Sequence, residues 1–146
     1  MHIALGSDHR GFELKSRLID YLQSAGHACL DFGCDNPESV DYPDFAVSVS
    51  QSVLNNQADY GVLICGSGIG MCIAANKIRG IRAAICCSPE LALRARRHNN
   101  ANILCLGSDF TDYATATAIT NNFIHTQFEG GRHQRRLDKI GEIESI

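Results

Sequence analysis

Short apolar runs alternate along the chain with longer segments in which apolar residues recur at helical spacing. The run Gly61-Val62-Leu63-Ile64-Cys65 lacks any alternation of apolar and polar positions, as expected for a central strand that is covered on both faces. Strands that alternate with helices are typical of α/β proteins with a parallel sheet. The predicted strands are His2–Gly6, Ala28–Phe32, Tyr60–Cys65, Arg82–Cys87 and Asn102–Leu106.

Helices are expected between these strands. Leu14, Leu18, Ile19 and Leu22 form one apolar stripe, and Gly26 follows as a helix stop. No internal repeat or linker interrupts the pattern, so residues 1–146 are expected to form a single domain. The predicted helices are Gly11–Ala25, a helix that begins near Pro43 and continues over Phe45–Leu54, Ile69–Ile78, a helix that begins at Ser88-Pro89-Glu90, Thr111–Thr126, and a last helix over about 132–146.

Composition narrows the class of protein. The chain has 146 residues, of which 45% are hydrophobic and 20% charged, which fits one ordinary soluble domain. A formal net charge of −3 argues against nucleic-acid binding, which usually needs a basic face. The N-terminus lacks the pattern of a signal peptide, and no apolar stretch approaches the roughly 20 residues of a membrane helix. We therefore expect a cytoplasmic protein that binds neither nucleic acid nor membranes.

Cysteine is frequent, with seven residues in the chain. An odd number without a secretory signal argues against a disulfide framework, and the absence of a C-x-x-C pair argues against a zinc ribbon or a thioredoxin-like site. Most of these cysteines lie in apolar runs, where a thiol packs as a small hydrophobic group. A functional cysteine therefore needs additional evidence from its surroundings.

Cys65 has such surroundings, because the turn Cys65-Gly66-Ser67-Gly68-Ile69-Gly70 joins the central strand to the next predicted helix. Alternating glycines let the backbone approach a ligand closely, and the free N–H groups of a helix N-terminus attract a phosphate or an enolate oxygen. The same N-terminus stabilises a thiolate, which favours a base or nucleophile at Cys65. A structural turn with a buried core cysteine explains these residues equally well, so both interpretations stay open here.

The sequence of this turn does not match either of two common nucleotide-binding motifs. The dinucleotide fingerprint G-x-G-x-x-G requires glycine where Met71 stands. A P-loop requires Gly-Lys followed by Ser or Thr, whereas Gly70 is followed by Met71-Cys72. The glycine turn therefore does not predict a nucleotide cofactor.

Polar residues also follow the first strand and begin the second helix. Asp8 and His9 stand directly after the first strand, where they would bind sugar hydroxyls and an anion or transfer protons. The alternative is that Asp8 caps the first helix and His9 is solvated. Tyr42 precedes Pro43 near the same edge of the predicted sheet, where it either contacts a ligand or packs.

Two further clusters lie near the end of the chain. His98 and Asn99 close the fourth helix, where the helix dipole alone also satisfies a histidine. Arg132 and Arg136 are four residues apart and so share one face of a helix. They either clamp a phosphate together or form a solvated basic face.

Taken together, these segments resemble the type B ribose-5-phosphate isomerases and their relatives, the galactose-6-phosphate isomerase subunits. The resemblance spans almost the whole chain, with the segments in the family's order. The segments that carry it are Gly6-Ser7-Asp8-His9-Arg10-Gly11, Asp41-Tyr42-Pro43, Ile64-Cys65-Gly66-Ser67-Gly68-Ile69-Gly70, Ala74-Ala75-Asn76-Lys77, Ile81-Arg82-Ala83, His98-Asn99 and Glu129-Gly130-Gly131-Arg132-His133.

The resemblance implies a three-layer αβα sandwich of Rossmann- or flavodoxin-like type with a five-stranded parallel sheet. It implies an isomerase that interconverts ribose 5-phosphate and ribulose 5-phosphate in the pentose phosphate pathway, without a metal ion or organic cofactor. It also implies a homodimer or homotetramer whose sites form at subunit contacts. The last helix, over about 132–146, has Leu137, Ile140 and Ile143 on one side and is therefore expected to pack on a neighbouring subunit.

The resemblance also implies roles for individual residues. Cys65 takes the proton from C2 of the aldose and returns it to C1 through a cis-enediolate, and Ser67 transfers the hydroxyl proton. His98 opens the sugar ring together with Asp8. The implied substrate-binding groups are the amides of Gly66, Gly68, Ile69 and Gly70 for the enediolate, Asn99 and Tyr42 for the sugar, and His9, Arg132 and Arg136 for the phosphate.

Position 109 departs from the family. Many relatives carry a phosphate-binding arginine after Gly107-Ser108, where this chain has Asp109. Because a carboxylate repels a phosphate, we expect that this loop points away or that the phosphate contact differs.

Two alternative functions stay open: an isomerase of a six-carbon phosphate such as allose or galactose 6-phosphate, and a non-catalytic phosphate- or nucleotide-binding module.

Overall fold

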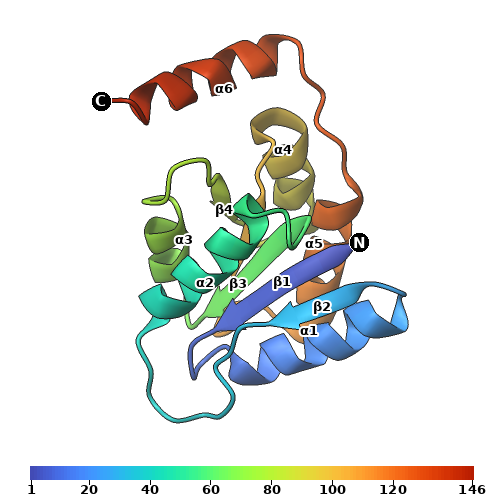
Figure 1. Cartoon of the computed structure of the whole chain (residues 1–146). Coiled ribbons are helices and arrows are strands. Elements are labelled where there is room, and N and C mark those ends of the chain that lie inside the picture. Colours follow the sequence, from blue (N-terminus) through green and yellow to red (C-terminus); the bar gives the residue numbers. More distant parts are fainter.

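A computed structural model describes residues 1–146, and every predicted strand and helix is present (Figure 1). The strands are β1 (His2–Ser7), β2 (Ala28–Asp31), β3 (Tyr60–Cys65), β4 (Ala83–Ile85) and β5 (Ile103–Gly107). The helices are α1 (Phe12–Ser24), α2 (Tyr42–Leu54), α3 (Ile69–Ala75), α4 (Pro89–Asn99), α5 (Tyr113–His125) and α6 (Arg132–Ile143).

Helix α3 ends at Ala75, earlier than the predicted Ile78, because the next residue bonds to a strand. The side-chain carbonyl of Asn76 accepts a hydrogen bond from the N–H of Ala83 at 2.8 Å, and its amide donates to the Ala83 carbonyl at 2.9 Å. These two bonds replace a further helical turn and fix the chain at the start of β4.

The sheet has the order β2-β1-β3-β5-β4, and all neighbouring strands are parallel. This confirms the predicted five-stranded parallel sheet, with β4 at the edge rather than between β3 and β5. β2 lies on one side of β1, whereas β5 and β4 lie on the far side of β3, so the direction of strand addition reverses between β1 and β3. In open α/β sheets, ligands bind beyond the carboxyl ends of the strands at such a switch point. The loops that follow β1 and β3 therefore mark the expected crevice.

Helices cover both faces of the sheet and make three layers. Side chains of β3 alternate between two cores: Val62 and Ile64 pack against α1, α4 and α5, whereas Leu63 and Cys65 pack against α2 and α3. Ile3, Val62 and Leu63 are all fully buried, as expected for strands covered on both faces. The three-layer αβα sandwich is therefore confirmed.

Helix α6 lies outside these layers and crosses the top of the molecule in Figure 1. His133 is its one buried residue, and Ile143 is 64% exposed. A groove of about 580 Å³ separates α6 from the body of the domain, with Ile81, Ala84, Leu137 and Ile140 among its lining residues. The apolar side of α6 is thus left without a full partner in its own chain.

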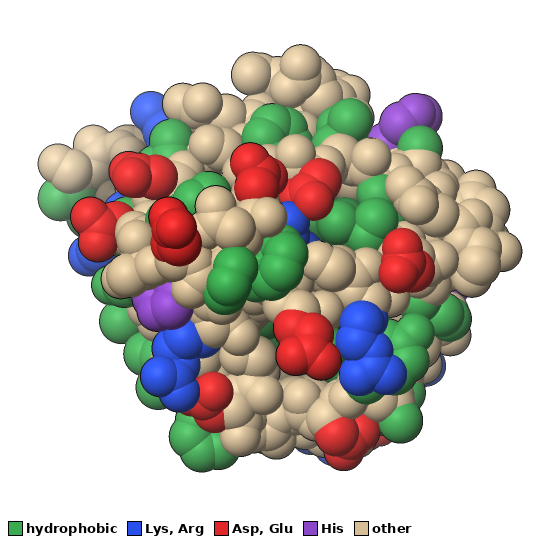
Figure 2. Space-filling view, turned by 90° about the horizontal axis from the view of Figure 1, so that it is seen from below, with side chains coloured by type: hydrophobic (Ala, Val, Ile, Leu, Met, Phe, Trp, Pro, Cys, Tyr) green, Lys and Arg blue, Asp and Glu red, His purple; other side chains and the backbone are tan.

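The molecular surface mixes both signs of charge. Seen from below in Figure 2, acidic and basic side chains are scattered over this face with apolar side chains between them. This face therefore lacks the broad basic patch that nucleic-acid binding usually requires. None of the helices has both the length and the apolar character that crossing a membrane would take.

Candidate active site

The loops after β1, β3 and β5 meet at the carboxyl edge of the sheet. The N–H of Asp8 donates to the carbonyl of Ile64 at 3.2 Å, which ties the first loop to the end of β3. The N–H of Ser108 donates to the carbonyl of Cys65 at 2.9 Å, and the N–H of Asp109 donates to that of Gly66 at 3.0 Å. These backbone bonds hold the three loops in a fixed arrangement around Cys65.

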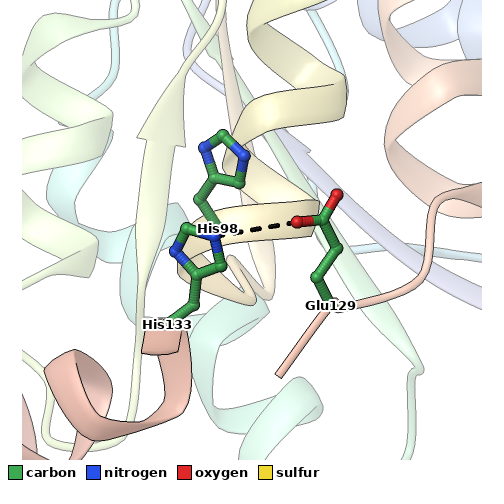
Figure 3. Close-up of side chains that lie close together, drawn as sticks. All are labelled: His98, Glu129 and His133. Atoms are coloured by element: carbon green, nitrogen blue, oxygen red, sulfur yellow. Dashed lines mark ion pairs between the residues drawn. The ribbon is translucent and has the colours of Figure 1, made fainter. Parts of the chain in front are cut away.

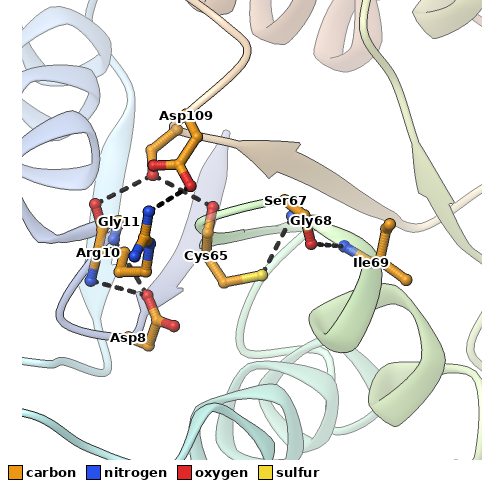
Figure 4. A network of polar contacts seen from close by, with 9 residues as sticks. Asp8, Arg10, Gly11, Cys65, Ser67, Gly68, Ile69 and Asp109 are labelled. Atoms are coloured by element: carbon orange, nitrogen blue, oxygen red, sulfur yellow. Dashed lines mark hydrogen bonds and ion pairs between the residues drawn. The ribbon is translucent and has the colours of Figure 1, made fainter.

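The Cys65 thiol lies beneath the glycine turn and is only 5% exposed. The N–H of Gly68 donates a hydrogen bond to Cys65 Sγ at 3.1 Å (Figure 4). Gly68 has φ of +78°, a conformation that other residues rarely adopt, and this aims its N–H back at the sulfur. The backbone amide is therefore a hydrogen-bond donor aimed directly at the Cys65 sulfur.

Ser67 and Tyr42 complete the surroundings of the turn. Ser67 Oγ accepts a hydrogen bond from the N–H of Ile69 at 3.2 Å, and its side chain is half-buried. The ring of Tyr42 lies against Gly70, because a Cβ at position 70 would be 2.7 Å from Tyr42 Cζ. The structure therefore brings Tyr42 to the glycine turn, as the sequence suggested.

Asp8 and His9 belong to the same edge. Asp8 is buried, and one carboxylate oxygen accepts hydrogen bonds from the N–H groups of Arg10 at 3.0 Å and Gly11 at 3.1 Å. This oxygen therefore closes the turn before α1 and does not cap the helix, whose cap residue is Gly11 and which has no side-chain cap. The second oxygen makes no hydrogen bond within the chain. His9 Nδ1 accepts from the N–H of Val40 at 3.3 Å, which places the proton of the neutral ring on Nε2.

Asp109 points toward a cation. Its Oδ2 accepts a hydrogen bond from Arg10 Nη2 at 2.5 Å, so the acidic side chain expected to repel a phosphate is paired (Figure 4). These two residues are 99 positions apart. Sequence reasoning gave no role to Arg10, because only the folded sheet brings the first and last loops together.

His98 and Asn99 lie at the opposite edge of the sheet. They end α4 just before β5 begins, and the Asn99 carbonyl accepts a hydrogen bond from Arg82 Nε at 3.1 Å beside the start of β4. Helices in such a fold run antiparallel to the strands, so the end of α4 lies at the amino edge. Asp8 and His98 therefore do not meet within one chain.

His98 stacks on His133 of α6, with ring centroids 4.4 Å apart and planes 12° from parallel (Figure 3). His133 Nε2 lies 3.7 Å from a carboxylate oxygen of Glu129. Burial, followed by electrostatic interactions with His98 and Arg132, holds the pKa of His133 below its usual value. His133 is therefore neutral near pH 7 and offers an uncharged face on which the His98 ring rests.

The same three side chains are poorly arranged to hold a metal ion. The ligand atoms of His98, Glu129 and His133 lie within 4.8 Å of one another. The lone pairs of an imidazole lie in the ring plane, so two stacked, nearly parallel rings cannot both direct one at a single ion. Arg97 Nε, 3.9 Å from Glu129, places a further positive charge there. The geometry fits a stacked histidine pair better than a metal centre.

Arg132 and Arg136 begin α6 and are both exposed. They belong with His98 and Asn99, because His133 of the same helix stacks on His98. The residues singled out from sequence thus form two groups on opposite edges of the sheet. The carboxyl-edge group is Asp8, His9, Tyr42, Cys65, Gly66, Ser67, Gly68, Ile69 and Gly70, and the amino-edge group is His98, Asn99, Arg132 and Arg136.

Sequence reasoning also gave no role to Glu129 or His133. Their spacing of four residues was a usable signal, since residues so placed on a helix or its first turn contact each other. Their contact with His98 joins segments that are distant in sequence and could not be read from spacing.

Comparisons with known proteins bear on this arrangement. Residues 3–140 match the Ribose/Galactose Isomerase family. The chain is 48% identical to a putative sugar phosphate isomerase of Rickettsia bellii, over 94% of this chain and 96% of that protein. It is 42% identical to ribose-5-phosphate isomerase B of Escherichia coli, over 97% of this chain and 95% of that protein.

Solved structures are also similar. A ribose-5-phosphate isomerase B of Clostridium thermocellum has a TM-score of 0.98 and 46% identity, covering 99% of this chain and 98% of that one. A ribose-5-phosphate isomerase B of Mycoplasma genitalium with bound ribulose-5-phosphate has a TM-score of 0.94 and 43% identity, covering 99% and 96%. These matches span nearly the full length of both chains, so they concern the whole fold.

Proposed function

The chain belongs to the Ribose/Galactose Isomerase family, and we propose that it interconverts ribose 5-phosphate and ribulose 5-phosphate. Similar proteins are named ribose-5-phosphate isomerase B, and one similar structure holds ribulose-5-phosphate. The observation that supports the chemistry is the buried Cys65 thiol with the Gly68 N–H 3.1 Å from its sulfur. We place this activity in the cytoplasm, in the pentose phosphate pathway.

In the proposed reaction, the Cys65 thiolate removes the proton from C2 of the open-chain aldose. The electrons of that bond form a double bond between C1 and C2, and the aldehyde oxygen becomes the oxyanion of a cis-enediolate. Cys65 then returns the proton to C1. Ser67 moves the hydroxyl proton from O2 to O1, which leaves the ketone at C2 and a hydroxyl at C1.

The amides of the turn from Gly66 to Gly70 stabilise the enediolate in this proposal. The Gly68 N–H first supports the thiolate, and once Cys65 has taken the proton this donor is available to the negative oxygen. A donor aimed at charge that develops during a reaction typically contributes about 3 kcal/mol to the transition state. The mechanism needs no metal or organic cofactor.

A second copy of the chain completes the site in this proposal. Ring opening requires an acid or base near the sugar, but His98 lies at the opposite edge of the sheet from Cys65 within its own chain. The groove beneath α6 and the exposed Ile143 offer an apolar surface for a partner. We infer a homodimer, or a tetramer made of two such dimers, in which His98 of the partner subunit faces Cys65.

The remaining substrate contacts are also divided between the two subunits in this proposal. Asp8, His9 and Tyr42 come from the chain that supplies Cys65. The partner subunit supplies the others in this proposal: Asn99 of the partner subunit for the sugar, and Arg132 of the partner subunit and Arg136 of the partner subunit for the phosphate. Asp8 then assists His98 of the partner subunit in opening the ring.

Isomerisation of ribose 5-phosphate in D₂O tests the proposal. The wild type should form ribulose 5-phosphate that carries deuterium at C1, because the proton on Cys65 exchanges with solvent between the two transfers. Cys65→Ala should lose about 10²–10⁴-fold in rate, the usual contribution of a general base. A Cys65→Ala variant that is as active as the wild type would refute the mechanism.

Six-carbon substrates are the second candidate, because the matching family includes galactose isomerases. Rates with ribose 5-phosphate, allose 6-phosphate and galactose 6-phosphate, compared as kcat/KM, decide between the two. A higher value for either hexose phosphate would assign the chain to that substrate while leaving the role of Cys65 unchanged.

A further inference from the structure

Arg10 packs directly on the glycine turn that carries Cys65. A Cβ placed on Gly66 would lie 2.6 Å from Arg10 Nε and 3.0 Å from Arg10 Cδ, so only glycine leaves room for this side chain. The same Cβ would lie 2.9 Å from Asp109 Oδ2, the oxygen that accepts the hydrogen bond from Arg10. Arg10 and Asp109 thus form one ion pair resting on the turn (Figure 4).

The backbone of Arg10 is fixed as firmly as its side chain. Its N–H donates to Asp8 Oδ1 at 3.0 Å. The hydroxyl of Ser108 bridges the carbonyl of Arg10, at 3.0 Å, and the carbonyl of Cys65, at 3.2 Å. The position of Arg10 relative to Cys65 is therefore set by bonds from the loops after β1, β3 and β5 together.

The ion pair leaves most of the guanidinium available. The Arg10 side chain is 57% exposed, and only one of its five N–H donors is bonded, to Asp109. Arg10 in turn balances the negative charge of Asp109, which reduces the repulsion between this carboxylate and an incoming anion. A planar guanidinium with unused donors is the side chain best suited to bind two phosphate oxygens at once.

We propose that Arg10, held on Gly66 by Asp109, binds the phosphate of the sugar substrate and gives the site its preference for phosphorylated sugars. This inference rests on the proposed function, but it assigns a residue that the proton transfer does not require. His9 is its neighbour in sequence, so the phosphate is contacted from two adjacent positions of one loop.

The test compares Arg10→Gln with Arg17→Gln, in which a nearby arginine stacked on Tyr113 at 3.8 Å loses the same charge. Binding of inorganic phosphate is measured by isothermal titration calorimetry, and kcat and KM are measured with ribose 5-phosphate. Arg10→Gln should weaken phosphate binding and raise KM by about tenfold, or about 1.4 kcal/mol, while kcat stays within about threefold. Arg17→Gln should leave all three values near those of the wild type.

A double variant separates binding from charge compensation. Arg10→Gln alone leaves Asp109 without its counter-ion, and this charge by itself repels phosphate. Arg10→Gln combined with Asp109→Asn removes that repulsion, and it should still bind phosphate about tenfold more weakly than the wild type. If the double variant binds phosphate like the wild type, Arg10 serves only to neutralise Asp109 and the proposal is wrong.

Other results would also overturn it. These are an Arg10→Gln variant that binds phosphate within twofold of the wild type, a control variant that loses as much affinity, or a wild type to which phosphate does not bind. A wild type that binds phosphate but isomerises no sugar phosphate would contradict the proposed function instead. The phosphate titration would still test Arg10 in that case.

Discussion

The separation of Cys65 from His98 predicts how two inactive variants behave when they share a dimer. Cys65→Ala removes the proposed base, and His98→Asn removes the imidazole proposed to open the ring. Each variant alone should lose about 10²–10⁴-fold in rate, because each lacks one group that transfers protons. Mixed dimers of the two variants should recover activity, because one of their two sites contains both groups.

The distance within one chain follows from strand register. Cys65 pairs with Gly107 at the carboxyl end of β5, whereas His98 precedes Ile103 at the amino end. The residue steps from Ile103 to Gly107, at about 3.3 Å each, separate the two ends by roughly 13 Å. A change of side-chain rotamer cannot close this gap, so His98 and Cys65 of the same chain cannot act on one sugar.

The recovered activity has a calculable size. In a mixed dimer, one site combines an intact Cys65 with an intact His98 of the partner subunit, and the other site lacks both. A purified mixed dimer should therefore show about half of the wild-type rate, and random pairing of equal amounts should give about one quarter. A tetramer of two dimers gives the same fractions for each site.

The assay coexpresses the two variants with different affinity tags, isolates the doubly tagged species, and measures initial rates of ribulose 5-phosphate formation. The control is a doubly tagged dimer in which both chains carry Cys65→Ala, which should stay inactive. A doubly tagged mixed dimer that is no more active than its parents would refute the shared site.

Three further outcomes are expected. Gly68→Ala should lower the free energy of unfolding by about 1–3 kcal/mol and reduce turnover, because φ of +78° strains an alanine; wild-type stability in urea would contradict this. The pKa of His133 is lowered, chiefly by burial, so the unfolded chain binds the proton first and stability is lost as pH falls below about 6.5. The melting temperature of the wild type should therefore fall more on acidification than that of His133→Gln, and parallel curves would argue against it. The pKa of Cys72 is lowered to about 7, mainly by a hydrogen bond from Cys105, whereas burial raises that of Cys86 to about 12. Iodoacetamide followed by peptide mapping should label Cys72 near pH 7 and leave Cys86 unlabelled, and equal labelling would contradict the prediction.

The fold was predictable because burial leaves a direct mark on sequence. The central strand has residues such as Val62 and Leu63 that are buried on opposite faces, and this produces a continuous apolar run. Helix α1 has one buried face, which produces the spaced stripe that includes Leu14 and Leu18. The order of strands was harder to predict. β5 lies between β3 and β4 although it follows β4 in the sequence, and the apolar patterns of these two strands do not record this order.

The candidate site was only partly predictable, because some of its contacts are local in sequence and others join distant segments. Cys65 and Gly68 are close in sequence, so a local motif describes their contact. Arg10 and Asp109 meet only because the loops after β1 and β5 both reach the loop after β3 that lies between them, and local patterns do not record such contacts. Likewise, the direction of α4 places His98 and Asp8 of one chain on opposite edges, so the pairing implied by the resemblance requires a second copy of the chain.

The glycine turn shows why its spacing resembles a nucleotide motif without being one. Gly66 leaves room for Arg10, and Gly70 leaves room for the ring of Tyr42. Gly68 has positive φ and would place a Cβ against the end of β5. The dinucleotide fingerprint requires a third glycine where Met71 stands, and Met71 is fully buried among α2 and α3. The glycines are therefore explained by the side chains and the strand that pack on the turn, and the Gly68 N–H is directed at the Cys65 sulfur.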